Sequence, residues 1–334
     1  MRRRAFDLRH MSPELDRLLE AIQRRGAKTV GLQFPVGLRP RAVELASEIE
    51  ERAAVTCLIA ADPSFGACDV PDMPVDLIVH VAHAPMPHLR YRNVFFYDMP
   101  TPLPESWAFL DAALPLLKPR VGILTTTQHR EWVPHIEGYL RGKGFEPVVS
   151  EPDRRVAYAA QVLGCDYFTA TNITDRVDSY LYVGTGDFHP LGVAIIVDKP
   201  VVIADPSTGE ARTLDEVKDR VLRQRWGAIA RSQDARTFGI IVSKKIGQDR
   251  SALAADLKAR IEAKGRSAHV FYMDLVAPEL LEGYHVDVWV STACPRVAIE
   301  DYLRYKCPIL TPRELEIVLG ERAGTEYSFD EIRA

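Results

Sequence analysis

The sequence predicts an α/β protein of three similar lobes, each a four-stranded parallel sheet with flanking helices. Two observations lead to this fold class. The same order of elements occurs three times along the 334 residues, and the strand-like runs are apolar throughout rather than alternating. Such runs, when helices separate them, are typical of parallel sheets covered on both faces. A chain of this length is also long enough for two or three domains.

Each repeat begins with a strand, an amphipathic helix and a second strand. Glycine stands where the helices of the second and third repeats end, at Gly144 and Gly265, which is the usual place of a C-cap. The strand–helix–strand runs are 29–33, 40–53 and 55–60 in the first repeat, 121–127, 130–142 and 145–150 in the second, and 238–243, 250–264 and 267–272 in the third.

Each repeat ends with two more strands. One begins with the dipeptide Val-Asp, and the other runs into a proline; these segments are 75–79 and 94–100, 177–183 and 201–206, and 286–290 and 308–312. The lobes are expected at 1–103, 104–208 and 209–334, the first boundary lying in a proline-rich stretch. Parallel sheets bind ligands at the carboxyl ends of their strands, so three lobes facing inward would share a central site.

Composition and charge exclude several classes of protein. The formal net charge is −4, without the basic stripe expected of a nucleic-acid binder. No run of about 18 apolar residues is present, so no membrane span is expected. The basic run at 2–4 is interpreted as a solvated end, not a targeting signal. We therefore expect a cytoplasmic protein without a membrane or nucleic-acid partner.

The five cysteines divide into two kinds. Their odd number, without a signal peptide, argues against a disulfide framework. Cys57 lies inside an apolar strand and Cys307 begins the last strand of the third lobe, so both are expected to be packed structural residues. Each lobe also has one cysteine in a loop, preceded by small residues: Cys68, Cys165 and Cys294.

The three loop cysteines are candidate metal ligands, because thiolates are soft ligands for zinc or iron–sulfur clusters. Three cysteines would leave one iron of a four-iron cluster without a protein ligand, and zinc with an open fourth position is chemically possible as well. There is no compact C-x-x-C motif. The spacing alone therefore leaves a cluster, a zinc site and three unrelated cysteines open.

Five motifs narrow this choice. They are LQFPVGL at 32–38, GACDV at 66–70, VLGC at 162–165, VGTGDFHPLG at 183–192 and TACPR at 292–296. Their order and their spread over nearly the whole chain resemble the 2-(3-amino-3-carboxypropyl)histidine synthase family, whose members begin diphthamide biosynthesis. Any one run is weak, but the set is specific.

The resemblance implies a fold, a cofactor and a reaction. Cys68, Cys165 and Cys294 would hold one [4Fe-4S] cluster at the centre of the lobes, with S-adenosylmethionine as co-substrate at the open iron. Cleavage of its bond from sulfur to the γ-carbon would give a 3-amino-3-carboxypropyl radical and release methylthioadenosine. The radical would add to the imidazole C2 of a histidine in translation elongation factor 2. The resemblance also implies a homodimer, and the chemistry requires an electron donor, which the sequence does not identify.

Seven further residues are candidates for binding S-adenosylmethionine. They stand after predicted strands or beside a loop cysteine, and Arg296 would suit the methionyl carboxylate. Each also has a structural interpretation, such as a glycine turn, a buried histidine or a surface ion pair. The candidates are Gln33, Pro35, Gly184, Thr185, Gly186, His189 and Arg296. No catalytic residue beyond the cluster ligands is assigned.

Four other side chains have weaker functional interpretations. His80 and His83 lie on the Val-Asp strand of the first lobe, where buried structural histidines are commoner than functional ones. Asp69 and Asp166 follow loop cysteines and are expected to cap short helices.

Two other functions stay open at this point. The first is a quinolinate-synthase-like [4Fe-4S] dehydratase. That family also looks like three related lobes that each provide one cysteine to the cluster, but it needs no S-adenosylmethionine. A non-catalytic cluster-bearing partner subunit is the second. Release of methylthioadenosine on reduction separates the transferase from the dehydratase, and a colourless protein after anaerobic purification would exclude any cluster.

Overall fold

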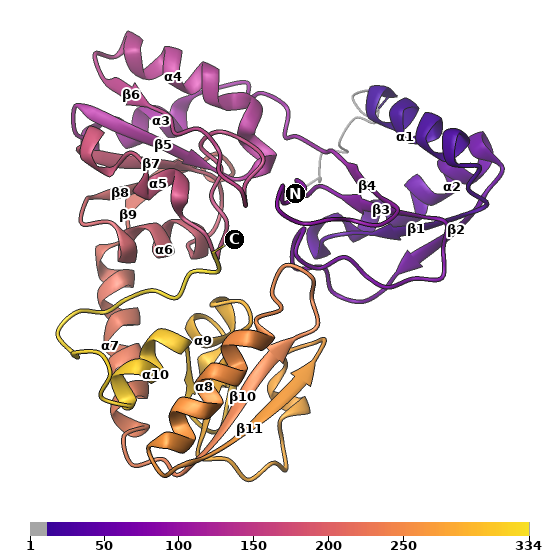
Figure 1. The fold of residues 1–334 in the computed structure, drawn as a ribbon. Helices are drawn as coiled ribbons and strands as arrows, with labels where there is room; N and C mark the ends of the chain where they lie inside the picture. Colours follow the sequence, from indigo (N-terminus) through magenta and orange to yellow (C-terminus); the bar gives the residue numbers. More distant parts are fainter. Residues whose placement is uncertain (1–11, 334) are drawn as a thin grey trace. The chain divides into compact units, whose positions relative to one another are not determined.

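The computed structural model describes residues 12–333, so the basic run at 2–4 lies outside the described residues. The chain divides into two compact units, Met1–Pro102 and Leu103–Ala334, called the first and second unit below. Within the described range, no helix is both long and apolar enough to cross a membrane. Figure 1 shows the ribbon with its elements labelled.

The first unit is one four-stranded parallel sheet in the order β2-β1-β3-β4. Leu15, Leu18 and Ile22 form the apolar face of its first helix and are buried in the core. The elements in chain order are α1 (Ser12–Arg25), β1 (Thr29–Gln33), η2 (Val36–Arg41), α2 (Ala42–Ala53), β2 (Thr56–Ala60), β3 (Leu77–Val81) and β4 (Val94–Tyr97).

The second unit contains two sheets. The middle sheet has the order β6-β5-β7-β8-β9, in which only β9 is antiparallel. Its elements are α3 (Ala108–Ala113), η3 (Leu114–Leu116), β5 (Arg120–Thr125), η4 (Thr127–Trp132), α4 (Val133–Gly142), β6 (Glu146–Val148), α5 (Phe168–Thr171), η5 (Thr174–Arg176), β7 (Ser179–Val183), α6 (Phe188–Ile196), β8 (Val201–Asp205) and β9 (Glu210–Thr213).

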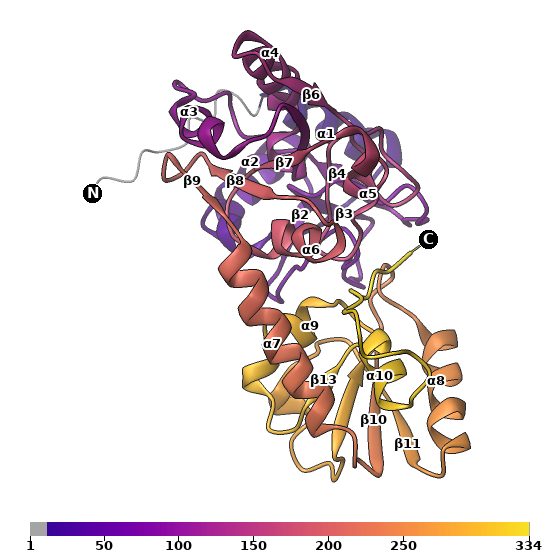
Figure 2. The ribbon, with the colours of Figure 1, turned by 90° about the vertical axis from the view of Figure 1, so that its left-hand side faces the viewer.

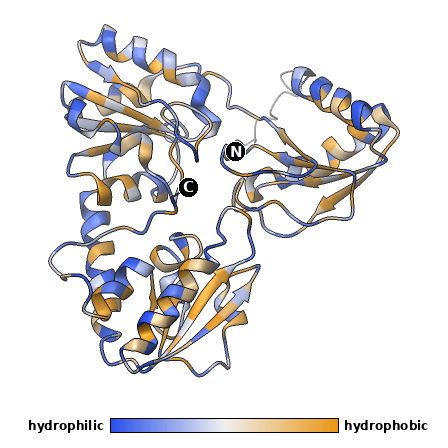
Figure 3. Ribbon diagram, viewed as in Figure 1, coloured by the Kyte–Doolittle hydropathy of each residue, from blue (hydrophilic) through white to orange (hydrophobic). Residues whose placement is uncertain are grey.

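The third sheet is parallel, in the order β11-β10-β12-β13. Its strands carry the strongest hydrophobic colouring in this part of the chain (Figure 3). The elements are α7 (Asp215–Arg231), β10 (Thr237–Ser243), α8 (Ser251–Ala263), β11 (Ser267–Met273), η6 (Pro278–Leu280), β12 (Val288–Ser291), α9 (Arg296–Ile299), η7 (Tyr302–Arg304), β13 (Ile309–Leu310) and α10 (Pro312–Val318).

The middle and third sheets are joined by α7, which runs from one to the other (Figure 2). Ile299 of α9 and Phe329 of the C-terminal segment belong to the hydrophobic core beneath the middle sheet. Within α7, the buried Arg225 forms an ion pair with Glu314 of α10 and donates a hydrogen bond to the carbonyl of Ala298 in α9. Residues that follow the strands of the third sheet thus contribute to the core of the middle sheet, and a buried ion pair fixes α7 to α10.

The predicted fold class is confirmed, and each predicted set of four parallel strands is present. Gly144 and Gly265 have positive φ angles of 86° and 72°, as their predicted C-cap positions require. The strand β9 adds a fifth, antiparallel strand to the middle sheet, which the sequence did not reveal. The helices α1 and α7 were not predicted either. The three lobe boundaries stay a prediction.

The repeated Val-Asp dipeptide has a structural role. In the first unit, Asp76 accepts hydrogen bonds from the backbone N–H groups of Lys28 and Thr29, where β1 begins. These bonds lower the pKa of Asp76. Asp178 and Asp287 accept N–H groups in the same way at the starts of β5 and β10. The dipeptide thus links the first and third strands of every repeat.

Candidate metal centre

Each loop cysteine follows the carboxyl end of a strand in its own sheet. Cys68 lies between β2 and β3, and Cys165 lies between β6 and β7, where Val162 donates its N–H to the carbonyl of Thr125 at the end of β5. Cys294 comes after β12. This edge is where parallel sheets bind ligands. The three loops are not fully equivalent, because Cys68 and Cys165 precede the third strand of their repeats whereas Cys294 follows it.

The Cys68 loop is anchored by residues of the first unit. Gln33, buried at the end of β1, donates from Nε2 to the carbonyl of Asp69 (2.8 Å). The Asp69 carboxylate accepts the N–H of Phe65 (3.1 Å), which closes the loop around the cysteine. The Tyr91 hydroxyl donates to the carbonyl of Ala67 (3.1 Å). Asp69 therefore braces a loop, where the sequence led us to expect a helix cap.

A chain of hydrogen bonds extends from Gln33 into the core of the first unit. The Oε1 atom of Gln33 pairs with Nδ1 of His80, whose Nε2 lies 2.9 Å from Nδ1 of His83. Burial lowers the pKa of His80 to about 3, with a further contribution from His83, and burial lowers the pKa of His83 to about 4. Both rings are therefore neutral near pH 7 and act as hydrogen-bonding groups.

Cys165 sits in a tight turn of the second unit. Leu163 donates its N–H to the carbonyl of Asp166 (3.1 Å), and Ile332 of the C-terminal segment donates its N–H to the carbonyl of Cys165 (2.9 Å). The buried Arg155 donates from Nη2 to the Cys165 sulfur (3.5 Å). Asp166 also accepts the N–H of Phe168, the first residue of α5 (3.0 Å), although Tyr167 and not Asp166 occupies the N-cap position.

Cys294 is held by the third sheet and by α9. The buried side chain of Gln248 accepts the N–H of Cys294 (3.2 Å), and Thr292 bonds through both its N–H and its hydroxyl to the carbonyl of Ile241. The short helix α9 begins two residues after the cysteine, and the guanidinium of Arg225 bonds to its carbonyl at Ala298. The backbone around Cys294 is thus fixed on both sides.

Cys165 and Cys294 act on the same buried side chain. Burial raises the pKa of the Tyr167 phenol well above its ordinary value, and the charges of Cys165 and Cys294 raise it further. Tyr167 stands two residues after Cys165 and packs edge-on against Phe329. The second unit therefore brings two of the three predicted ligands into the neighbourhood of one phenol.

The VGTGDFHPLG run lies at the same edge. Gly184, Thr185 and Gly186 connect the end of β7 to the start of α6, and Gly186 has a φ of 75°. The predicted turn after a strand is therefore present. Gly184 is buried, whereas Thr185 and Gly186 are exposed to solvent.

Phe188, at the start of α6, connects this turn with both cysteine loops of the second unit. The guanidinium of Arg296 lies 5.4 Å from the centre of the Phe188 ring. A Cβ on Gly164 would lie 2.0 Å from the same ring, so only glycine fits before Cys165. Arg296 also forms an ion pair with Glu300 and is 55% exposed.

His189 completes this group. Its ring stacks on Tyr182, with 6.4 Å between the ring centres. Burial lowers the pKa of His189 to about 4, and the positive charge of Arg296 lowers it further. His189 and Arg296, predicted from separate motifs, are therefore close enough to influence each other.

The remaining predicted residues lie in the first unit or serve structure. Gln33 anchors the Cys68 loop, and Pro35 precedes η2. Cys57 lies on β2, where burial and the nearby Glu50 raise the pKa of its thiol to about 11. Cys307 donates to the carbonyl of Val286 and packs in the third lobe. No cysteine forms a disulfide.

The sequence did not reveal Arg155, Tyr167, Phe188 or Gln248 as residues of the site. Phe188 had a signal, because it lies inside the VGTGDFHPLG run, and Tyr167 stands only two residues after a predicted ligand. Arg155 and Gln248 had none, since their partners become neighbours only through the fold.

The donor set fits an iron–sulfur cluster. Thiolates suit Fe–S chemistry, and an N–H donor to the ligand sulfur, as Arg155 provides to Cys165, is a common feature of such clusters. Over residues 12–333, no group of three or more His, Cys, Asp or Glu side chains that could hold a metal ion is present.

Comparison with known proteins places the chain in a family. The family model described as "Putative diphthamide synthesis protein" matches residues 34–328. The 2-(3-amino-3-carboxypropyl)histidine synthase of Pyrococcus horikoshii is 35% identical, over 94% of this chain and 92% of the relative. The human protein named subunit 1 of this synthase is 27% identical, over 92% of this chain and 72% of the relative.

A solved structure agrees with these matches. The crystal structure of Dph2 from Pyrococcus horikoshii with a 4Fe-4S cluster superposes with a TM-score of 0.82 at 33% identity, covering 96% of this chain and 93% of that chain. The similarity thus includes sequence, fold and nearly the full length. This chain belongs to the diphthamide synthesis protein family.

Proposed function

We propose that this chain is a 2-(3-amino-3-carboxypropyl)histidine synthase. It transfers a 3-amino-3-carboxypropyl group from S-adenosylmethionine to the imidazole C2 of a histidine in translation elongation factor 2, the first step of diphthamide biosynthesis. The observation that carries the proposal is the match to the family along almost the whole chain, in which each of the three sheets is followed by one loop cysteine.

The cofactor of this proposal is a [4Fe-4S] cluster held by Cys68, Cys165 and Cys294. With one iron free of protein ligands, the cluster supplies an electron to S-adenosylmethionine, whose bond from sulfur to the γ-carbon breaks to give the 3-amino-3-carboxypropyl radical and methylthioadenosine. The chain's own residues hold and orient the reactants, which is how a protein selects the bond that reacts. The similarity to the Pyrococcus structure solved with a 4Fe-4S cluster supports this assignment.

S-adenosylmethionine is assigned to the loops around the cysteines. In the second unit, the turn at Gly184, Thr185 and Gly186 can bring backbone groups close to the co-substrate, because Gly186 is exposed and has no side chain to cover it. Arg296 is exposed beside this turn and would bind the methionyl carboxylate, exchanging its present partner Glu300 for the co-substrate.

The other candidates extend the assignment. His189 is neutral near pH 7 and can serve as a hydrogen-bonding group to the co-substrate. Gln33 and Pro35 would contribute from the first unit. Gln33 already uses both ends of its amide to brace the Cys68 loop and His80, so its contribution would be to position that loop.

The partners follow from the same assignment. Translation elongation factor 2 is the protein substrate, and an external electron donor is required. The Pyrococcus and Methanocaldococcus relatives carry no subunit number in their names, whereas the human relative is named subunit 1. This difference favours a homodimer. A substrate that works in translation places the reaction in the cytoplasm. The similarities favour neither the quinolinate-synthase-like dehydratase nor the non-catalytic partner subunit.

The test is an anaerobic assay. Purified protein is mixed with dithionite, S-adenosylmethionine and unmodified translation elongation factor 2. The expected result is a mass increase of one 3-amino-3-carboxypropyl group on a histidine, with methylthioadenosine in equal amount. Methylthioadenosine without a modified protein would contradict the assigned acceptor. A protein that carries a cluster but releases no methylthioadenosine would contradict the reaction.

A further inference from the structure

Arg155 is a charged side chain buried beside a predicted cluster ligand. It is 2% exposed, and its Nη2 atom lies 3.5 Å from the sulfur of Cys165. Its Nε atom lies 3.6 Å from Oδ2 of Asp166, whose side chain is 6% exposed. A guanidinium keeps its proton in proteins, so this contact places a permanent positive charge against the sulfur.

The geometry favours the sulfur as a main partner of this charge. The Nη2 atom of Arg155 lies within hydrogen-bond distance of the Cys165 sulfur, at 3.5 Å. The distance between Arg155 and Asp166 is longer than that of a direct charged hydrogen bond. The Cys165 sulfur is thus a hydrogen-bond acceptor for this buried charge.

The position of Arg155 is specific. Its neighbour Arg154 is exposed to solvent, although it carries the same charge one residue earlier in the same loop. The Asp153 carboxylate accepts the backbone N–H groups of Arg155 (2.7 Å) and Val156 (3.0 Å), which fixes the loop where Arg155 turns inward. The two arginines therefore form a matched pair that differs in burial and in contact with the sulfur.

We propose that Arg155 raises the reduction potential of the cluster, because it donates a hydrogen bond to the sulfur of Cys165 and holds a positive charge beside it. This inference rests on the proposed function. Reduction adds one electron, and the added negative charge is spread over the cluster and its ligand sulfurs. Cluster charge and hydrogen bonds to those sulfurs set the potentials of Fe–S centres, and a nearby positive charge stabilises the reduced form. Arg155 is a positioning residue that acts through Cys165.

The test is a mediated redox titration of the reconstituted cluster, followed by electron paramagnetic resonance. One electron passes from dithionite to the cluster, and no bond in the protein is made or broken. In Arg155→Gln the equilibrium constant for reduction is expected to fall about tenfold, which is about 59 mV for a one-electron couple. Arg155→Lys, which keeps the charge, is expected to recover most of this loss. Arg154→Gln is the control and should match the wild type.

The outcomes separate this inference from the proposed function. A wild-type protein that binds no cluster contradicts the proposed function itself. A wild-type cluster whose potential is unchanged by Arg155→Gln, or is changed equally by Arg154→Gln, overturns the role of Arg155 and leaves the proposed function intact.

A second measurement applies if Arg155→Gln does not bind a cluster. Wild-type protein labelled with ¹⁵N-arginine is reduced and examined by pulsed electron paramagnetic resonance. A hyperfine coupling from arginine nitrogen is expected, and it should disappear in unlabelled protein and in labelled Arg155→Lys. Absence of this coupling in labelled wild-type protein overturns the inference.

Discussion

The Cys68 loop and the Cys165 turn are expected to do the same work, but they are anchored in different ways. The Cys68 loop is held by groups of the first unit, namely the Gln33 amide, the Tyr91 hydroxyl and the Asp69 carboxylate. The Cys165 turn is held by the charged Arg155 and by Ile332 near the end of the chain. Contacts within the first unit thus hold one cysteine loop, whereas a nearby arginine and the distant C-terminal segment hold the other.

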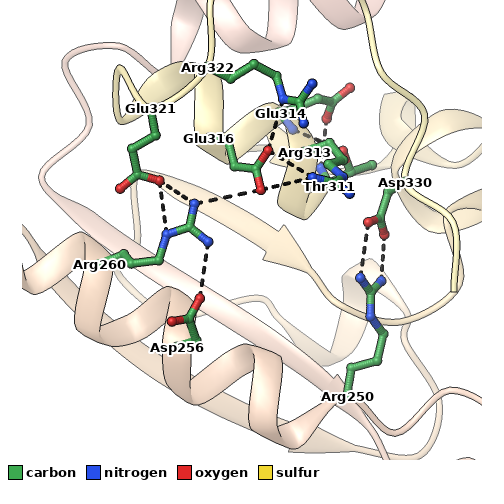
Figure 4. A network of polar contacts seen from close by, with 10 residues as sticks. All are labelled: Arg250, Asp256, Arg260, Thr311, Arg313, Glu314, Glu316, Glu321, Arg322 and Asp330. Carbon is green, nitrogen blue, oxygen red and sulfur yellow. Dashed lines mark hydrogen bonds and ion pairs between the residues drawn. The ribbon is translucent and has the colours of Figure 1, made fainter. Parts of the chain in front are cut away.

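The difference shows that the Cys165 turn depends on the folding of the second unit, including its C-terminal segment. The C-terminal segment reaches the Cys165 turn through Ile332. In the same segment, Asp330 forms an ion pair with Arg250 at 2.6 Å (Figure 4). Arg250 also lies 3.5 Å from the carbonyl of Thr292, near Cys294. Damage to the core of the second unit should therefore disturb Cys165 and Cys294 and spare the Cys68 loop.

The largest effect is expected from the ligands themselves, whatever their anchoring. Cys68→Ala, Cys165→Ala and Cys294→Ala should each abolish the bound cluster and the transferase activity, because each removes one of three protein ligands. Iron content after anaerobic reconstitution is the measurement. Cys57→Ala and Cys307→Ala are the controls and should keep normal iron. Normal iron in any of the first three would remove that cysteine from the site.

The buried ion pair of the second unit should give the next largest effect. Arg225→Met leaves Glu314 buried without its partner, which is expected to cost about 3–5 kcal/mol of unfolding free energy. All four tryptophans lie in the second unit, so their fluorescence during urea unfolding reports on it alone. The double variant Arg225→Met/Glu314→Leu should regain part of the loss. Equal loss of amide protection in β1 would show that the two units do not respond separately.

The paired histidines should make the stability of the first unit depend on pH. Both have pKa values below the ordinary 6.5, so the unfolded chain binds protons first as the pH falls. The folded state therefore loses stability below pH 6.5, by about 2 kcal/mol for each histidine between pH 6.5 and 5. The loss should continue until the pH passes the folded-state values.

Hydrogen exchange in β1 and β3 at pH 7 and pH 5 measures this loss. The double variant His80→Gln/His83→Gln should flatten the dependence on pH, whereas His285→Gln, which replaces an exposed histidine of the second unit, should leave it unchanged. A dependence that survives the double variant would assign the proton uptake to other groups.

The smallest effect concerns the packing of the Cys165 turn. Gly164→Ala places a Cβ 2.0 Å from the Phe188 ring, so the ring must move, at an expected cost of about 1–3 kcal/mol. Gly138→Ala is the matched control: it lies on the exposed side of α4 with nothing within 4 Å, and it should stabilise the unit by about 0.5–1 kcal/mol. Tryptophan fluorescence in urea follows both. A neutral Gly164→Ala would show that the turn tolerates a displaced Phe188.

Much of the fold was predictable because apolar runs and the helical segments between them indicate the strands locally. The strand β1 begins and ends at the predicted residues, and β11 differs from its prediction only at its end. The helix α7 was missed for a physical reason. Arg225 interrupts its apolar stripe, and it is buried only because Glu314, far along the chain, is its partner. The strand β9 was missed because its short polar sequence, Glu210–Thr213, carries no strand pattern.

The site divides in the same way. Cys165 and Cys294 were predicted from small residues and from the family runs, and both lie in loops of the second unit. Arg155 was not predicted, because a charged residue in a polar loop normally faces solvent, as Arg154 does. Its burial depends on Asp166 and on the Cys165 sulfur. Contacts of this kind arise only when the fold is complete.

The most direct test of the central claim is differential alkylation of wild-type protein, read by peptide mass spectrometry. Anaerobic protein that carries its cluster is treated with iodoacetamide before and after iron is removed with a chelator. We expect Cys68, Cys165 and Cys294 to be protected together by the cluster and to become reactive together when it is removed, while Cys57 and Cys307 do not change. If any of the three reacts equally in both states, the claim that one cluster joins them is contradicted.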